Sequence, residues 1–242
     1  MSVSANSIRW DDKGVPHSLH FRDKYFCTQN GYEEYHHISS AGNLLPERFA
    51  QLDPTAPGTF TLMETGFGTG LCFCTMWEIW DRFAPKSWEL HFVSLELYPL
   101  SNADLDRALS FWPSVKKYHK LLAAHYQPYA DGTRHLNFPE HRVRLSIVFE
   151  DVIVALKKIH DENVAPYKAD AWLLNGFSPF ANPQMWTPEV FAGMAKLSKP
   201  GTTLSTFTVA GHVRRGLEAA GFRVERIPGY GTKKQMLKGR RP

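Results

Sequence analysis

Thr59-Phe-Thr-Leu-Met-Glu-Thr-Gly-Phe-Gly-Thr-Gly-Leu71 is the stretch that decides the fold of this 242-residue chain. Its first six residues form a short apolar run that predicts a β-strand, and the three glycines that follow predict a tight turn. The next segment, 71–83, is apolar and long enough for an α-helix. This order of strand, glycine-rich turn and helix is typical of α/β proteins that bind a ligand at the turn.

The same strand-and-helix unit recurs along the chain. Further strands are predicted at 90–96, 143–149, 170–174 and 202–207. Helices are predicted at 102–110 with Ser101 as N-cap, and at 152–160, 188–197 and 213–220. The alternation predicts a mainly parallel sheet with helices on both faces, and segments 222–227 and 235–238 predict an antiparallel pair that closes it.

Two regions lie outside this pattern. Residues 1–52 are polar and aromatic with several turn signals, and they predict a β-hairpin-rich extension packed on a main domain at 53–242. Residues 111–140, rich in Trp, His, Tyr and Pro, predict an insertion that contains a helix around 115–126.

Composition excludes several classes of protein. Hydrophobic residues make up 43% of the chain and include 16 Phe, enough for a sizeable core, while no apolar run approaches the roughly 20 residues that span a bilayer. The N-terminus does not resemble a secretory signal, and three cysteines are too few for a disulfide framework. We therefore expect a cytoplasmic protein that is not attached to a membrane. Cys72 and Cys74 lack a second cysteine pair, so no metal site is expected.

The positive charge of the chain gathers near its end. The formal net charge is only +4, but the last twelve residues read GTKKQMLKGRRP. Candidate contacts to nucleic-acid phosphates in this region are Arg214, Arg215, Lys233 and Lys234. The alternative is a solvated terminal strand whose cations keep the sheet edge soluble, and charge alone leaves both open.

Candidate ligand-binding residues follow the predicted strands. Gly66, Gly68 and Gly70 follow the first strand, Glu96 ends the second, and Asp151 follows the third. Ligands of such sheets bind beyond the carboxyl ends of the strands, where one acid can accept both hydroxyls of a ribose and another an adenine amine. Helix capping or surface charge is the alternative for both acids. Together these features predict an adenosine-containing cofactor.

The glycine spacing separates two such cofactors. The motif reads E-x-G-x-G-x-G and lacks the G-x-G-x-x-G spacing that seats the pyrophosphate of a nicotinamide dinucleotide. The antiparallel pair at the end of the sheet also fits a methyltransferase better than an oxidoreductase. We therefore expect S-adenosylmethionine.

Three long motifs resemble a known family: METGFGTGL at 63–71, DAWLLNGFSPFANPQMW at 170–186 and TFTVAGHVRRGLEAAGF at 206–222. They are similar to the methyltransferase domain of the bacterial tRNA 5-methylaminomethyl-2-thiouridine biosynthesis protein, the MnmC family, over about 8–239. The resemblance implies a Rossmann-type methyltransferase fold and methylation of the aminomethyl group of 5-aminomethyl-2-thiouridine at the tRNA wobble position. In many members a flavin-dependent oxidase domain follows and prepares that substrate.

The resemblance also assigns residues. The implied cofactor-binding residues are Glu64, Gly66, Phe67, Gly68, Gly70, Glu96, Asp151 and Asn175. Asn175 and Phe177 are the implied catalytic residues, in a loop that faces the methyl group. Arg214, Arg215, Lys233 and Lys234 are the implied contacts to tRNA.

This chain departs from the family pattern at Asn175, where members usually have Asp, and at Cys72 and Cys74. A carboxylate can bind an ammonium and help to remove its proton, which an amide cannot. The Asn175 carbonyl can still accept a hydrogen bond from a neutral amine and orient it. Three interpretations stay open: activity with altered pH behaviour, a different amine substrate, or a catalytically impaired relative that binds cofactor and tRNA.

Two other functions are compatible with parts of the sequence. A non-catalytic RNA-binding module predicts salt-dependent tRNA affinity without a cofactor site, and a nicotinamide-dependent oxidoreductase is disfavoured by the glycine spacing.

Trp77 and Trp80 share one helix face and are expected in the core. Phe177 or Phe180 is a candidate to stack on a flipped wobble base.

Overall fold

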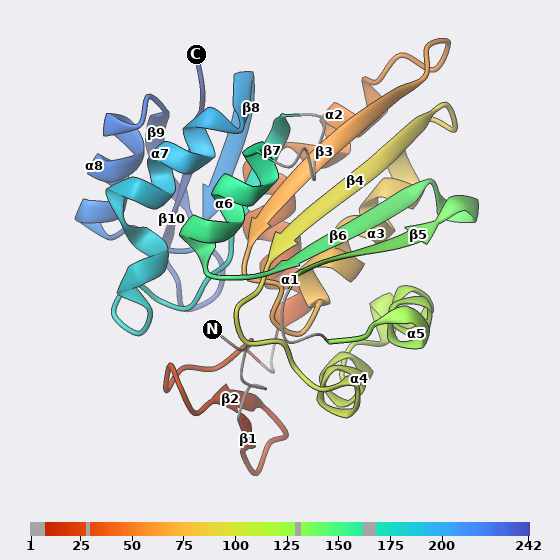
Figure 1. Cartoon of the computed structure of the whole chain (residues 1–242), viewed down its shortest axis with the longest axis vertical. Coiled ribbons are helices and arrows are strands. Elements are labelled where there is room, and N and C mark those ends of the chain that lie inside the picture. The colour runs from red at the N-terminus through yellow and green to blue at the C-terminus, as the bar shows by residue number, and fades with distance from the viewer. Residues whose placement is uncertain (1–7, 28–29, 129–131, 162–167) are drawn as a thin grey trace.

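The computed structural model describes residues 8–27, 30–128, 132–161 and 168–242. Its sheet strands are, in chain order, β3 (Gly58–Thr65), β4 (Trp88–Leu95), β5 (Gly132–Phe138), β6 (Val143–Phe149), β7 (Ala169–Leu174), β8 (Ser198–Thr206), β9 (Arg223–Pro228) and β10 (Gln235–Arg240). In the described part of the chain they pair as one eight-stranded sheet in the order β5-β6-β4-β3-β7-β8-β10-β9 (Figure 1).

The middle of the sheet is parallel and its edges are not. β6, β4, β3, β7 and β8 are parallel neighbours, whereas β5 pairs antiparallel with β6, and β10 pairs antiparallel with both β8 and β9. The predicted parallel sheet with an antiparallel closing pair is confirmed. From β3 the chain proceeds to β4 and β6 on one side and to β7 and β8 on the other, so the strand order switches at β3. Ligands bind at such a switch point.

Helices cover both faces of the sheet (Figure 1). One face packs against α3 (Leu71–Phe83), α4 (Asn102–Ser110), α5 (Lys116–His125) and the short helices α1 (Gly31–Tyr35) and α2 (Leu45–Ala50). The other face packs against α6 (Val152–Asp161), α7 (Pro188–Lys196) and α8 (Gly211–Ala219). Each face has its own apolar core, which explains why the central strands are apolar throughout rather than alternating.

Several local predictions are confirmed. Trp77 and Trp80 are fully buried in the core under α3. The Ser101 side chain accepts a hydrogen bond from the Asp104 backbone N–H at the start of α4, as an N-cap does. The helix expected in the insertion is α5.

Two regions differ from the prediction in detail. The N-terminal segment contains the expected hairpin, β1 (Ile8–Trp10) with β2 (Pro16–Ser18), but residues 31–50 are helical and include a π-helix, His36–Ser40. These helices are one or two turns long, too short to show a 3.6-residue apolar period. The predicted insertion also contains β5, an edge strand in which Phe138 alone is buried and Arg134, His135 and Asn137 are exposed, so no apolar alternation marks it. Residues 1–7 and 28–29 of the extension, and 129–131 of the insertion, lie outside the described residues.

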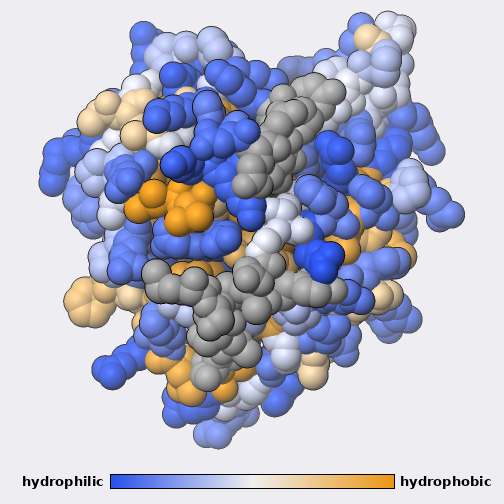
Figure 2. All heavy atoms as spheres, viewed as in Figure 1, coloured by the Kyte–Doolittle hydropathy of each residue, from blue (hydrophilic) through white to orange (hydrophobic). Residues whose placement is uncertain are grey.

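The surface seen in Figure 2 is mostly hydrophilic, with apolar side chains exposed in small groups. Among the described residues, the structure contains no helix long and apolar enough to cross a bilayer.

Candidate active site

A pocket of about 320 Å³ opens at the carboxyl ends of the parallel strands, in the size range of ligand sites. One wall is the turn after β3, and others are the loops that follow β4, β6 and β7. The other walls come from the N-terminal segment between His20 and Ile38, and from Phe207, Thr232 and Lys233. The predicted residues that line the pocket are Gly66, Phe67, Gly68, Glu96, Asp151, Asn175, Phe177 and Lys233.

The glycine turn holds the pocket open. Gly66, Gly68 and Gly70 have φ of +100°, +54° and +74°, a region that side chains disfavour. The backbone N–H groups of Gly66 and Phe67 donate to Leu95 O at 3.0 and 3.1 Å, which ties the turn to the end of β4. Gly70 lies outside the pocket wall and precedes α3, whose first turn has no side-chain cap.

Glu96 forms the floor next to this turn. Its Oε2 accepts the Gly68 N–H at 2.8 Å, and its Oε1 accepts the Tyr98 N–H at 2.8 Å. Burial raises the pKa of Glu96 to about 7, although the backbone N–H groups oppose that shift. The backbone N–H groups of Leu97 and Phe67 also favour the charged carboxylate.

Asp151 stands at the end of β6, on the same side of the pocket. Its Oδ1 accepts the Ile153 N–H at 2.9 Å at the start of α6. Asp151 thus caps a helix, as the alternative interpretation held, and also lines the pocket. The second oxygen, Oδ2, has the acceptor capacity that an adenine amine needs.

Asn175 is the centre of a polar network behind the pocket wall. Its Nδ2 donates to Glu64 Oε1 and to Cys72 Sγ, both at 3.1 Å, and Ser39 Oγ lies 3.4 Å from its Oδ1. Ser94 Oγ donates to Glu64 Oε2 at 2.7 Å. Glu64 Oε1 thus accepts from the amide nitrogen of Asn175, while the carbonyl oxygen of Asn175 accepts from Ser39.

Glu64 itself is 1% exposed and does not line the pocket. Burial raises the pKa of its carboxyl to about 7, and hydrogen bonds from Ser94, Asn175 and Cys72 oppose the shift. The structure thus places Glu64 behind the pocket wall, in contact with Asn175 and Ser94.

The two phenylalanines after β7 are placed differently. The Phe177 ring packs against the rings of Phe21 and Tyr25, with centroids 4.8 and 5.0 Å apart, and Trp186 Nε1 donates to its carbonyl oxygen at 2.9 Å. Phe180 is 98% exposed. Phe177 is therefore a fixed part of the wall, whereas Phe180 projects into solvent beside it.

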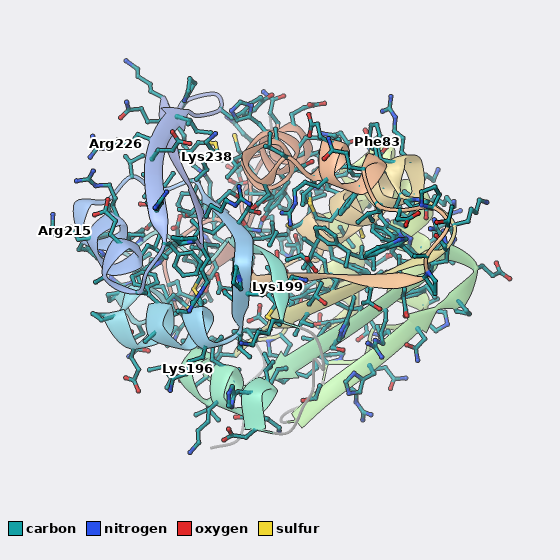
Figure 3. The ribbon with its side chains drawn as sticks, turned by 90° about the horizontal axis from the view of Figure 1, so that it is seen from above. Phe83, Lys196, Lys199, Arg215, Arg226 and Lys238 are labelled. Atoms are coloured by element: carbon teal, nitrogen blue, oxygen red, sulfur yellow. The ribbon has the colours of Figure 1, made fainter. Side chains whose placement is uncertain are left out.

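The four basic residues predicted to contact tRNA lie in different surroundings. Lys233 lines the pocket and donates from Nζ to Glu34 Oε1 at 2.5 Å, and Arg214 lies 3.8 Å from Glu218 on α8. Arg215 and Lys234 are exposed. Figure 3 shows Arg215 on the outside of the region formed by α7, α8, β9 and β10, which also carries Arg226 and Lys238.

Sequence reasoning missed the contribution of the N-terminal segment. Glu34 and Tyr35 of α1 line the pocket, and Ser39 of the π-helix contacts Asn175. The interleaved aromatic and charged residues of this segment are visible in the sequence, but no spacing marks them as functional. Among the described residues, no three His, Cys, Asp or Glu side chains gather as a metal site requires.

Comparison with known proteins adds three findings. A family model described as S-adenosyl-L-methionine-dependent methyltransferase matches residues 113–242, more than half of the chain. The "tRNA 5-methylaminomethyl-2-thiouridine biosynthesis bifunctional protein MnmC" of Methylobacillus flagellatus is 44% identical over 98% of this chain, and that of Pseudomonas savastanoi is 43% identical over 96%. The chain spans about a third of the length of these relatives, 35% and 34%.

A solved structure shares the fold. The crystal structure of MNMC2 from Aquifex aeolicus superposes with a TM-score of 0.74, covering 99% of this chain and 71% of that one at 16% identity. At this identity the likeness shows the fold alone.

Proposed function

Because this chain belongs to the family of S-adenosyl-L-methionine-dependent methyltransferases, we propose that it methylates the aminomethyl group of 5-aminomethyl-2-thiouridine at the tRNA wobble position. The names of the relatives that are 43–44% identical over nearly the whole chain support this substrate. The observation that carries the proposal is the orientation of Asn175, whose amide nitrogen is held by Glu64. Its carbonyl oxygen accepts from Ser39 Oγ at 3.4 Å and has a second lone pair, which we propose accepts an amine N–H from the pocket.

The residues of the pocket fit the cofactor. Gly66 and Gly68 have no side chain to fill the turn, and their positive φ keeps the backbone close to a ligand. Glu96 would accept the ribose hydroxyls, and Asp151 the adenine amine. When bound, S-adenosylmethionine supplies a methyl group on a positively charged sulfur. Gly70 and Glu64 do not line the pocket; they lie behind the wall of the proposed cofactor site.

In the proposed reaction Asn175 orients the amine rather than deprotonating it. A hydrogen bond to its carbonyl oxygen points the nitrogen lone pair away from that oxygen, into the pocket. Phe177 closes the wall beside Asn175 and excludes water. Phe180 offers an exposed ring on which an RNA base can stack.

The proposed partner is tRNA, held by phosphate contacts to Arg214, Arg215 and Lys234 outside the pocket. Lys233 faces Glu34 and is a weaker candidate for a phosphate contact. The relatives are called bifunctional, and we extend the proposal to a flavin-dependent oxidase, fused or separate, that acts first and releases the aminomethyl group.

The second candidate is a catalytically impaired relative that binds cofactor and tRNA, and Asn175 is the observation in its favour. The test is transfer of labelled methyl from S-adenosylmethionine to tRNA that carries the aminomethyl group, measured across pH, with cofactor affinity measured by calorimetry on the same sample. Methyl transfer supports the proposed enzyme. Tight cofactor binding without transfer supports the impaired relative. RNA affinity without any saturable cofactor site supports a non-catalytic RNA-binding module.

A further inference from the structure

The proposed reaction needs a proton acceptor that touches the substrate. A primary alkylamine is largely protonated near neutral pH, and only the free amine can attack a methyl group. The Asn175 amide cannot take a proton, and Glu64, which could, is 1% exposed beneath it. The acceptor must therefore be sought among the other side chains of the pocket.

Glu34 meets the geometric requirements. It lies on α1, lines the pocket, and its side chain is 17% exposed. Lys233 Nζ donates to Oε1, and within the described residues no hydrogen bond reaches the other oxygen, Oε2. The Lys233 ammonium also lies 4.2 Å from the centroid of the Phe207 ring, which fixes the cation in place.

The topology puts Glu34 on the same side as Asn175. Asn175 follows β7 and Phe207 follows β8, whereas Glu96 and Asp151 follow β4 and β6 on the other side of the switch point. Lys233 lies in the turn between β9 and β10, which are beyond β8 on the same side of the switch point as Asn175. Because Glu34 is paired with Lys233, it lies on that side as well.

Tyr35, the neighbour of Glu34 on α1, also lines the pocket. Burial raises the pKa of the Tyr35 hydroxyl well above its usual value, and the nearby Cys72, Glu64 and Glu34 raise it further. The N-terminal segment contributes two other charged side chains to the pocket lining, Asp23 and Lys24. Asp23 Oδ2 accepts the Ser178 N–H at 3.2 Å.

We infer that Glu34 binds the substrate ammonium and takes its proton, with Lys233 as the positioning residue that holds the carboxylate. This inference rests on the proposed function. The N–H bond breaks, an O–H bond forms on Glu34, and the electron pair stays on the nitrogen. That nitrogen then forms a bond to the methyl carbon while the carbon–sulfur pair passes to sulfur, and Glu34 releases its proton to solvent. Asn175 orients the same amine through its carbonyl oxygen.

The test compares Glu34→Gln with Glu33→Gln, an exposed neighbour on the same helix that does not line the pocket. At about pH 7 we expect Glu34→Gln to lower kcat by about 100-fold, the usual contribution of a positioned base, and Glu33→Gln to match wild type. The loss should shrink by about tenfold per pH unit as solvent deprotonates the amine. A loss of equal size at every pH, or none, overturns the inference.

A binding measurement separates this inference from the proposed function. Two anticodon stem-loops, with and without the aminomethyl group, are titrated into wild type, Glu34→Gln and Lys233→Met without methyl transfer. Wild type should prefer the aminomethyl form by about tenfold, and both variants should lose that preference while thermal melting shows them folded. An unchanged preference in Glu34→Gln overturns the role of Glu34. Wild type that binds both forms equally and transfers no methyl overturns the proposed function instead.

Discussion

The two halves of the pocket are built in different ways. In the half that would hold the cofactor, Glu96 contacts Gly68, 28 positions away in the sequence, and each wall is the loop directly after its own strand. In the half that would hold the amine, Asn175 contacts Glu64 at 111 positions, Ser39 lies near it at 136, and Glu34 contacts Lys233 at 199. The first half is a set of local strand-and-turn motifs, and the second exists only in the tertiary fold. Substitutions in one half should therefore leave the other largely intact.

The largest expected effect is on the cofactor half. Glu96→Ala removes two acceptor oxygens, and a hydrogen bond to a charged group contributes about 1.5–3 kcal/mol. We expect cofactor affinity to fall by about 100-fold, which is about 3 kcal/mol, while affinity for the tRNA stem-loop stays within about twofold. Isothermal titration calorimetry with each ligand measures both. Glu96→Gln, which keeps one oxygen, should lose less, and an equal loss of both ligands would show that the two halves are not independent.

Glu64 lies between the halves, and its burial makes folding depend on pH. Burial raises its pKa from 4.5 to about 7, so the folded protein binds more protons than the unfolded chain between these values. This carboxyl therefore stabilises the fold most below about pH 4.5, and the contribution is lost as pH rises to about 7. At about 1.4 kcal/mol per pKa unit the change is about 3 kcal/mol.

Glu64→Gln removes this dependence. The free energy of unfolding of the variant, minus that of wild type, should rise by about 3 kcal/mol between about pH 5 and pH 8. Urea unfolding at both values measures it, and Glu33→Gln, exposed on α1, is the control. Parallel pH profiles for wild type and Glu64→Gln would show that Glu64 stays ionised in the folded protein.

Asn175→Asp tests the amine half. An Asp at this position would lie at hydrogen-bond distance from Glu64, since the present contact is 3.1 Å. Two carboxylates so close share one proton, which raises the apparent pKa of the pair. Above that pKa the new carboxylate can help to deprotonate the amine, and we expect kcat to rise by about tenfold. Methyl transfer measured across pH gives the profile, and turnover that is unchanged at every pH would contradict the idea that a carboxylate is missing here.

The cofactor half of the pocket was predicted from the sequence because its motifs are local. The strands and helices around Gly66, Glu96 and Asp151 were predicted because their apolar runs and turn residues are adjacent in the sequence, and these three residues do line one pocket. Asn175 and Phe177 were found through a long motif. The fold predictions failed where elements are short, in the helices at 31–50, or polar, in β5.

The amine half was predicted less completely. Glu34, Tyr35 and Ser39 reach the pocket because a short helix and a π-helix turn them toward β7 and the turn before β10, and no local pattern encodes that packing. Lys233 was grouped with the phosphate contacts by its charge. Its partner Glu34 is 199 positions away, so the ion pair could not be inferred from composition.

The smallest expected effect separates the two phenylalanines beside Asn175. Stacking on one base contributes about 1–3 kcal/mol, so Phe180→Ala should weaken stem-loop binding by about fivefold, at the low end of that range, with unchanged thermal stability because the ring is 98% exposed. Phe177→Ala removes packing against Phe21 and Tyr25, so it should lower the melting temperature as well as RNA use. Fluorescence anisotropy and thermal melting of the two variants distinguish the roles. If Phe180→Ala binds like wild type while Phe177→Ala loses RNA affinity at full stability, then Phe177 is the stacking ring, and the wall of the amine half opens when RNA binds.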